Sequence, residues 1–128
     1  MLLYFSLSIT PQVKQRPRMA RGMVYTPAKT AQFERAVATM AKVHMGNQKP
    51  LTGPLKLTAR FVFKRPKKPA RSYPSKGDTT NFLKALEDGC NGVVWVDDVQ
   101  IVEIHAHKLY DVAEGESRIE MRVEEVSE

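Results

Sequence analysis

Several residue types are scarce in this sequence of 128 residues, and each scarcity excludes a class of protein. The single cysteine, Cys90, excludes an internal disulfide and is typical of a reducing compartment. No apolar run approaches the roughly eighteen residues of a membrane helix. The N-terminal segment 1–9 lacks a basic leader and predicts a strand rather than a signal peptide. We therefore expect a cytoplasmic protein without a membrane partner.

Acids are scarce in one part of the chain and bases in the other. Residues 11–76 contain sixteen Lys and Arg against one acid, Glu34, whereas residues 78–128 contain four Lys and Arg against thirteen acids. A split of this size within one short chain indicates a polyanionic partner that binds beside an acidic, metal-binding centre. Two solvated faces of opposite charge are the alternative.

The hydrophobic pattern predicts one domain, residues 1–128, of the mixed α/β (α+β) class, with a sheet of four or five strands packed with two helices. Alternating apolar residues place long strands at 2–9, 55–63, 101–110 and 117–126, and a short apolar run adds one at 93–96. A basic hairpin is expected at 18–25. One helix is expected at 26–45, with Thr30 as its N-terminal cap, and a second helix is expected to begin near residue 78. The exposed acids of the last strand predict a sheet edge, and residues 111–116 predict a turn.

The stretch 76–102 concentrates the residues that can do chemistry. At about 100° per residue, a helix from Asp78 places Asp78, Asn81, Lys84 and Asp88 on one face and Cys90 among apolar residues on the other. Cys90 is therefore expected to pack in the core. Asp78 has an ordinary alternative role as the N-terminal cap of the helix.

Asp97 and Asp98 follow the apolar run 93–96 directly, and adjacent carboxylates repel each other unless a cation offsets their charge. A strand that returned the chain to the start of the helix would bring this pair beside Asp78. The oxygens of Asp78, Asp98 and Asp97 would then suit Mg²⁺, with Mn²⁺ as the alternative ion. Lys84 could neutralise charge on a phosphate. We therefore expect these three acids and Lys84 to form a catalytic metal site, although a solvated turn also explains the acidic pair.

Two basic segments are candidates for nucleic-acid binding. Cations in segment 11–26 are spaced about two apart, and segment 64–76 combines Lys and Arg with three prolines. The second segment cannot form a core, should be an exposed loop, and leads directly to Asp78. Extended cationic segments can follow a phosphate backbone. The candidate DNA-binding residues are Lys14, Arg16, Arg18, Arg21, Lys64, Lys67, Lys68, Arg71 and Lys76.

The motif D-x-x-N-x-x-K-x-x-x-D-x-x-N-G, followed by an apolar run and DD-x-Q-[IV], resembles the RusA-type Holliday-junction resolvases. The residues that carry the resemblance are Asp78, Asn81, Lys84, Asp88, Asn91, Gly92, Asp97, Asp98, Gln100 and Ile101. The runs K-x-R-P-R and V-Y-T-P are similar to the amino-terminal part of the same family. The resemblance implies a RusA-like fold and a Mg²⁺-dependent homodimer that cuts four-way DNA junctions symmetrically in recombination and repair, from a bacterial or phage source.

This sequence departs from the family pattern at one position. The family usually opens its motif D-x-D-N, and both of those acids act with Mg²⁺, whereas Thr80 stands here in place of the second. Asp97, Glu87 and Glu103 are the acids that could replace it. A non-catalytic DNA-binding module of the same fold is the main alternative, and charge alone also allows an RNA-binding protein. Glu103, His105 and His107, spaced along one strand face, are an alternative ligand set for a transition metal.

Overall fold

A four-stranded mixed sheet with the strand order β1-β6-β4-β5 forms the centre of the computed structural model, which describes residues 1–112 and 115–127. Strands β1 (Leu2–Leu7), β6 (Arg118–Glu125) and β4 (Leu55–Phe63) pair antiparallel, whereas β5 (Ile101–Tyr110) runs parallel to β4. A parallel neighbour needs a crossover connection. Segment 64–100, which contains helix α2 (Thr79–Cys90), supplies it.

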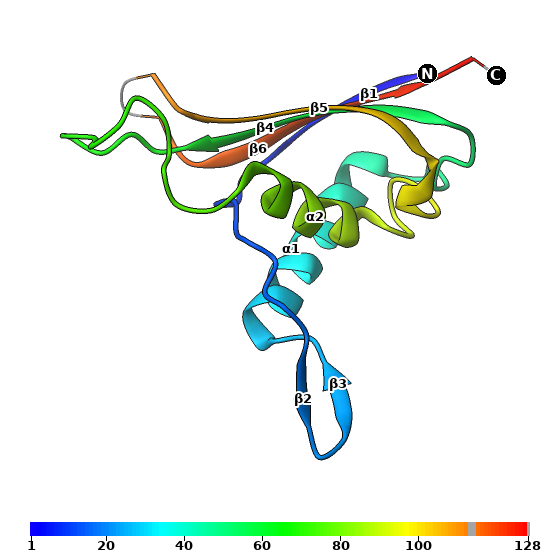
Figure 1. Cartoon of the computed structure of the whole chain (residues 1–128). Coiled ribbons are helices and arrows are strands. Elements are labelled where there is room, and N and C mark those ends of the chain that lie inside the picture. The colour runs from blue at the N-terminus through cyan, green and yellow to red at the C-terminus, as the bar shows by residue number, and fades with distance from the viewer. Residues whose placement is uncertain (113–114, 128) are drawn as a thin grey trace.

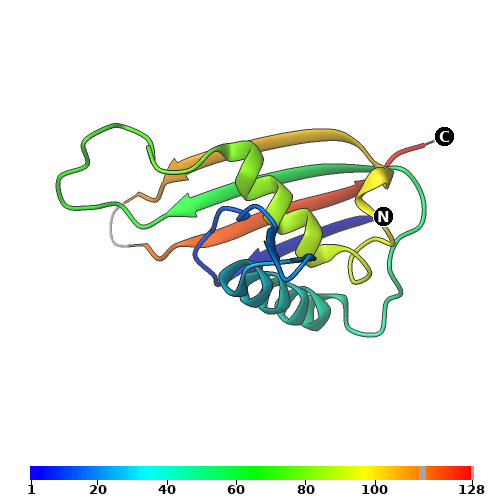
Figure 2. The same ribbon diagram turned by 60° about the horizontal axis from the view of Figure 1, so that its bottom comes forward.

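Both helices, α2 and α1 (Ala28–Met45), cover the same face of the sheet, and α2 crosses the strands obliquely (Figures 1 and 2). The buried core between the layers includes Val37 of α1, Leu86 of α2, and Leu57, Phe61 and Ile119 of the sheet. The helices and the sheet thus form the single α+β domain that the hydrophobic pattern predicts.

Strand β6 lies between β1 and β4, so the prediction that it forms a sheet edge is wrong. Its acids point to the face without helices, where they pair with arginines: Glu120 lies 2.8 Å from Arg60 and 2.9 Å from Arg118, and Glu124 lies 2.7 Å from Arg122. An exposed sheet face and a sheet edge therefore give the same alternating acidic pattern. The edge strands are β1 and β5.

The expected bounds of β4 and β5 are confirmed, whereas the predicted cap Thr30 is wrong. The N-cap position of helix α1 is occupied by Pro27, three residues before Thr30. Thr30 is buried, and its Oγ1 accepts a hydrogen bond from the Gln15 backbone N–H at 2.9 Å. Residues 113 and 114 of the predicted turn lie outside the described part of the chain.

The predicted strand 93–96 is also wrong. This run forms a tight turn in which the Gly92 N–H donates to the Trp95 carbonyl at 2.7 Å, and Leu51 pairs with Trp95 in a single bridge. Val94 and Trp95 are fully buried. Four apolar residues in a row indicate burial, but they do not distinguish a strand from a buried turn.

Strands β2 (Arg18–Ala20) and β3 (Met23–Tyr25) form the expected hairpin, which projects away from the sheet beyond α1 (Figure 1). All of its strand residues are exposed. Arg21 and Gly22 at its tip have φ angles of 52° and 75°, as a two-residue hairpin turn requires. Within the described residues, no helix has the length and apolar character needed to cross a membrane.

Candidate active site

Asp78 occupies the N-cap position of α2 with an extended backbone, at φ −90° and ψ 139°. Its carboxylate makes no capping hydrogen bond to the helix, and the residue is exposed. The interpretation of Asp78 as an ordinary cap is therefore wrong. Its two oxygens are available at the start of the helix, where the positive end of the helix dipole favours an anion.

Asp98 is held against the polar face of α2. Its Oδ2 atom accepts a hydrogen bond from Asn91 Nδ2 at 3.0 Å and lies 3.5 Å from Lys84 Nζ. Asp98 begins the short 3-10 helix η1 (Asp98–Gln100), in which the Gln100 amide donates to the carbonyls of Leu51 and Gly53 at 2.9 Å each. The turn that carries Asp98 is thus anchored on both sides, and its carboxylate has a defined position.

The position of Asp98 defines an active stripe, which consists of Thr80, Lys84 and Glu87 of α2 and the C-cap residue Asn91. Residues three or four apart share one side of a helix, so Glu87 lies between the two side chains that hold Asp98. Partial burial, followed by the negative charge of Asp98, raises the pKa of Glu87 from 4.5 to about 6. Asp98 therefore docks beyond the first turn of α2, rather than at the helix start as the sequence led us to expect.

A second ionic cluster ties the N-terminal arm, residues 8–17, to both helices. Lys14 Nζ lies 3.0 Å from Glu34 of α1 and forms an ion pair with Asp88 of α2, and Asp88 also lies 3.2 Å from Lys84. The Lys14 backbone N–H donates to Asn81 Oδ1 at 2.7 Å. Partial burial opposes the charge on Lys14, but its hydrogen bonds to Asp88 and Glu34 outweigh burial and raise the pKa of the ammonium.

Lys14 is consequently better placed to fix the arm than to bind a phosphate, and its role in DNA binding stays a prediction. Sequence reasoning missed this cluster. The signal was Glu34, the single acid of the basic region 11–76, which suits a structural ion pair.

The donor set suits a hard divalent ion only in part. Asp78 offers carboxylate oxygens at the start of α2, and Asp98 offers them further along the helix, beside Lys84 and Asn91. Mg²⁺ commonly binds through one or two carboxylates while it keeps waters and substrate oxygens. Within residues 1–112 and 115–127, however, no three His, Cys, Asp or Glu side chains gather closely enough to hold a metal. The described residues therefore form no complete metal site, and joint binding of Mg²⁺ by Asp78 and Asp98 stays a prediction. Asp97 is exposed, and its place as a ligand stays a prediction.

The structure separates the three acids that could replace a carboxylate at Thr80. Glu103 pairs in register with Lys56, next to the buried Leu57, so it points to the sheet face opposite the helices. There it contacts His105 at 3.3 Å. Glu103 is thus remote from the active stripe, whereas Glu87 belongs to it.

Cys90 is fully buried in the core, as expected. Burial raises the pKa of its thiol to about 12. Because the reactive form of cysteine is the thiolate, Cys90 does not serve as a nucleophile at neutral pH.

The other cations predicted to bind DNA lie on exposed segments on either side of the helices. Arg16, Arg18 and Arg21 belong to the arm and the hairpin, and segment 64–76 forms a long loop at one end of the sheet (Figure 1). The loop ends at Gly77, immediately before Asp78. Positive charge therefore reaches the start of α2 from the loop, as the sequence predicts.

Replacing Glu87 with Gln is expected to raise stability at pH 8 by about 1 kcal/mol and to have little effect near pH 4.5. The pKa of Glu87 is raised in the folded state, so its ionised form opposes folding above pH 6, and that cost disappears as the pH falls toward 4.5. The full shift would be worth about 2 kcal/mol, which solvent screening of this half-exposed group reduces.

Thermal unfolding followed by circular dichroism at both pH values measures this effect, with Glu116→Gln on the exposed surface as the control. An equal gain at pH 8 and pH 4.5 would contradict it.

Replacing Trp95 with Phe is expected to cost on the order of 2 kcal/mol and to disturb Asp98. The Trp95 indole N–H donates to Asn91 Oδ1 at 2.7 Å, and the amide of Asn91 in turn donates to Asp98. The substitution leaves a partly buried acceptor without its partner. Urea unfolding measures the loss, with Tyr73→Phe in the exposed loop as the control. If the free energy of unfolding of Trp95→Phe lies within about 0.5 kcal/mol of the parent value, roughly the range of neutral surface changes, this hydrogen bond contributes little to stability.

Comparison with known proteins identifies the family of the chain. The chain is similar over nearly its whole length to the uncharacterized protein YqaN of Bacillus subtilis (strain 168), with 28% identity over 140 aligned positions that cover 96% of each protein. The family model described as endodeoxyribonuclease RusA matches residues 8–124, which include the arm, both helices, the basic loop and the Asp97-Asp98 pair. The chain therefore belongs to the RusA endodeoxyribonuclease family.

Proposed function

We propose that this protein is a Mg²⁺-dependent endonuclease that cuts four-way DNA junctions by hydrolysis of a phosphodiester bond. The observation that carries the proposal is the position of Asp98, which Asn91 and Lys84 hold against the same helix that presents the unused Asp78 carboxylate at its start. Family membership supports the nuclease chemistry, and the asymmetric charge supports a DNA substrate.

In this proposal, Asp78 and Asp98 hold the ion, with Asp97 nearby. When bound, Mg²⁺ supplies an activated water and charge stabilisation at the phosphate. Lys84 neutralises the negative charge that develops on the phosphate or on the leaving oxygen. Partial burial opposes the charge on Lys84, but its hydrogen bond to Asp88 and the negative charges of Asp88 and Asp98 outweigh burial and raise the pKa of the ammonium. Lys84 therefore stays protonated during the reaction.

The substrate is expected to lie across the helix-bearing side of the molecule. The hairpin and the loop 64–76 carry exposed cations that can contact phosphates of different arms, since they project from separate parts of the fold (Figure 1). Such contacts position the DNA without reading its sequence.

A homodimer is part of the proposal, because a two-fold symmetric junction matches a two-fold symmetric protein. One subunit presents one candidate site, so symmetric cleavage of two strands requires two subunits. A role in recombination and repair and a cytoplasmic location follow from the substrate and stay expectations.

A non-catalytic DNA-binding module is the second candidate. It is favoured by Thr80, and by the finding that no acidic cluster for a metal is preformed among the described residues. It predicts junction binding that is independent of Mg²⁺ and no nicking at any concentration of divalent ion.

One gel assay distinguishes the candidates. Labelled four-way junction, duplex and single strands are incubated with the protein, with and without Mg²⁺ or Mn²⁺, and single-stranded RNA is added as competitor. Paired nicks in the junction that require the metal support the resolvase. Junction binding without nicks supports the binding module, and displacement by RNA at lower concentrations than by DNA supports an RNA-binding protein.

A further inference from the structure

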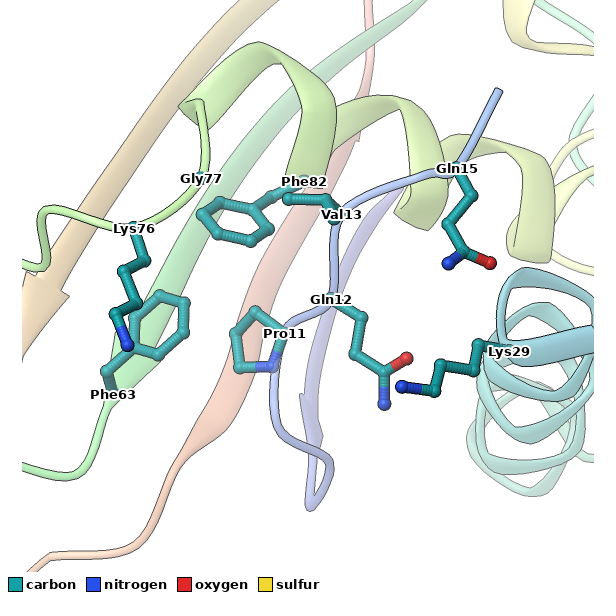
Figure 3. Close-up of a pocket in the computed structure, with 9 residues that line it drawn as sticks. All are labelled: Pro11, Gln12, Val13, Gln15, Lys29, Phe63, Lys76, Gly77 and Phe82. Carbon is teal, nitrogen blue, oxygen red and sulfur yellow. The ribbon is translucent and has the colours of Figure 1, made fainter. Parts of the chain in front are cut away.

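A cavity of about 440 Å³ lies beside the start of α2 (Figure 3). Five parts of the chain surround it: the arm, helix α1, the end of β4, the segment that leads into α2, and α2 itself. Gly77 belongs to its lining and immediately precedes Asp78. Whatever occupies the cavity therefore lies next to one of the two proposed metal ligands.

The floor of the cavity is apolar and aromatic. The partly exposed ring of Phe63 packs against the buried Phe82 with ring centroids 5.3 Å apart, and Pro11 and Val13 of the arm complete this surface. A free phosphate or a simple cation gains nothing from such a floor. A flat aromatic group does, because bases stack favourably on aromatic side chains.

The rim is polar and carries no acid among the lining residues. It presents the amides of Gln12 and Gln15 and the ammonium groups of Lys29 and Lys76 (Figure 3). Amides of this kind donate and accept hydrogen bonds along base edges, and the lysines can contact the phosphates on either side of a base.

The cavity is held open by its framework rather than formed by loose segments. Lys14 and Gln15 tie the arm to α2 and α1 through the hydrogen bonds already described, and the Lys108 ammonium donates to the Gly77 carbonyl at 2.9 Å. Gly77 has a φ of +82°, and a Cβ atom there would lie 2.5 Å from the ring of Phe82 and 2.9 Å from Val13. Any side chain at position 77 would push apart the walls of the cavity.

From the cavity's aromatic floor, its amide and lysine rim, and its position beside Asp78, we propose that it binds one unpaired nucleobase of the DNA strand that is cut. This inference rests on the proposed nuclease function. The base comes from a pair at the crossover, where stacking is interrupted and extrusion costs least. Its capture places the adjoining phosphate at the start of α2. The cavity also lies within the volume range of small-molecule sites, about 300–1,000 Å³.

Photo-crosslinking tests the proposal directly. Four-way junctions with 5-iododeoxyuridine at single positions around the crossover are bound to the full chain without divalent ion, irradiated, and mapped by mass spectrometry of the crosslinked peptides. We expect crosslinks to Phe63, the partly exposed aromatic residue of the floor, from one position next to the crossover. Gln12→Ala should lower their yield about five- to tenfold, since Gln12 would lose a contact to the base edge. Gln48→Ala, in the loop that follows α1, should leave the yield unchanged.

Gln12 is exposed, so its substitution does not threaten the fold. A second readout compares cleavage rates of four junctions that differ only in the base at the crosslinked position. Gln12→Ala should reduce the ratio of the fastest to the slowest of these rates by a similar factor. If the protein cuts junctions but crosslinks map only to other segments, or if Gln12→Ala changes neither readout, the base pocket is refuted while the nuclease function stands. If the protein neither binds nor cuts junctions, both are refuted.

Discussion

Replacing Asp98 or Asp78 with Asn is expected to lower junction cleavage by about a thousandfold or more, while junction binding stays the same or becomes tighter. Each change removes one negative charge and one oxygen ligand from the proposed Mg²⁺ site. Binding survives because the lost charge also repelled the phosphates. In Asp98→Asn, the new amide oxygen can still accept from Asn91 and Lys84, so the local structure should persist.

Single-turnover cleavage of a labelled junction over a range of Mg²⁺ concentrations measures the loss, and a gel shift without divalent ion measures binding. Glu103→Gln is the matched control, because it removes an acid from the opposite sheet face and should cut at the parent rate. Asp97→Asn shows which acid of the pair matters more for cleavage. We expect its cleavage rate to fall less than that of Asp98→Asn, because Asp97 is more exposed. Parent rates for both Asp78→Asn and Asp98→Asn would refute the proposed mechanism.

Much of the fold could be predicted because the alternation of apolar residues directly reports burial. The nine residues of β4 alternate between the helix face and the open face along most of their length, and both ends of the strand were predicted correctly. The same logic failed where one pattern serves two structures. The run 93–96 is buried as a turn, and the acids of β6 mark an open face rather than an edge.

The candidate site shows a similar division. The sequence identified Asp78, Lys84 and Asp98 as site residues, and the structure brings the last two together on α2. The sequence alone could not show where along α2 Asp98 lies, because that position depends on how the turn 91–95 and the amide of Gln100 anchor the segment. The roles of Asn91 and Lys14 were missed because each depends on a side-chain contact that the hydrophobic pattern does not report: Asn91 binds Asp98 across the intervening turn, and Lys14 pairs with Glu34 of α1.

Replacing Thr80 with Asp is expected to tighten Mg²⁺ binding by about tenfold or more and to raise cleavage by a similar factor at limiting Mg²⁺, because it adds a charged oxygen ligand to the site. Thr80 is exposed in the first turn of α2 and begins the active stripe that Lys84, Glu87 and Asn91 continue. A carboxylate there would lie between the start of the helix, where Asp78 projects, and the position at which Asp98 docks. Titration of Mn²⁺ followed by electron paramagnetic resonance measures affinity without reference to activity.

Thr79→Asp is the control that separates ligation from general electrostatics. An acid at either position complements the helix dipole and should stabilise α2 by about 0.3–1 kcal/mol, so both variants should unfold at slightly higher temperature. Position 79, however, lies about 100° around the helix from position 80, away from the active stripe. A gain in metal affinity confined to Thr80→Asp would therefore locate the ion at the active stripe. Equal gains in both variants would mean that the added charge acts at a distance, and no gain in either would place the ion elsewhere.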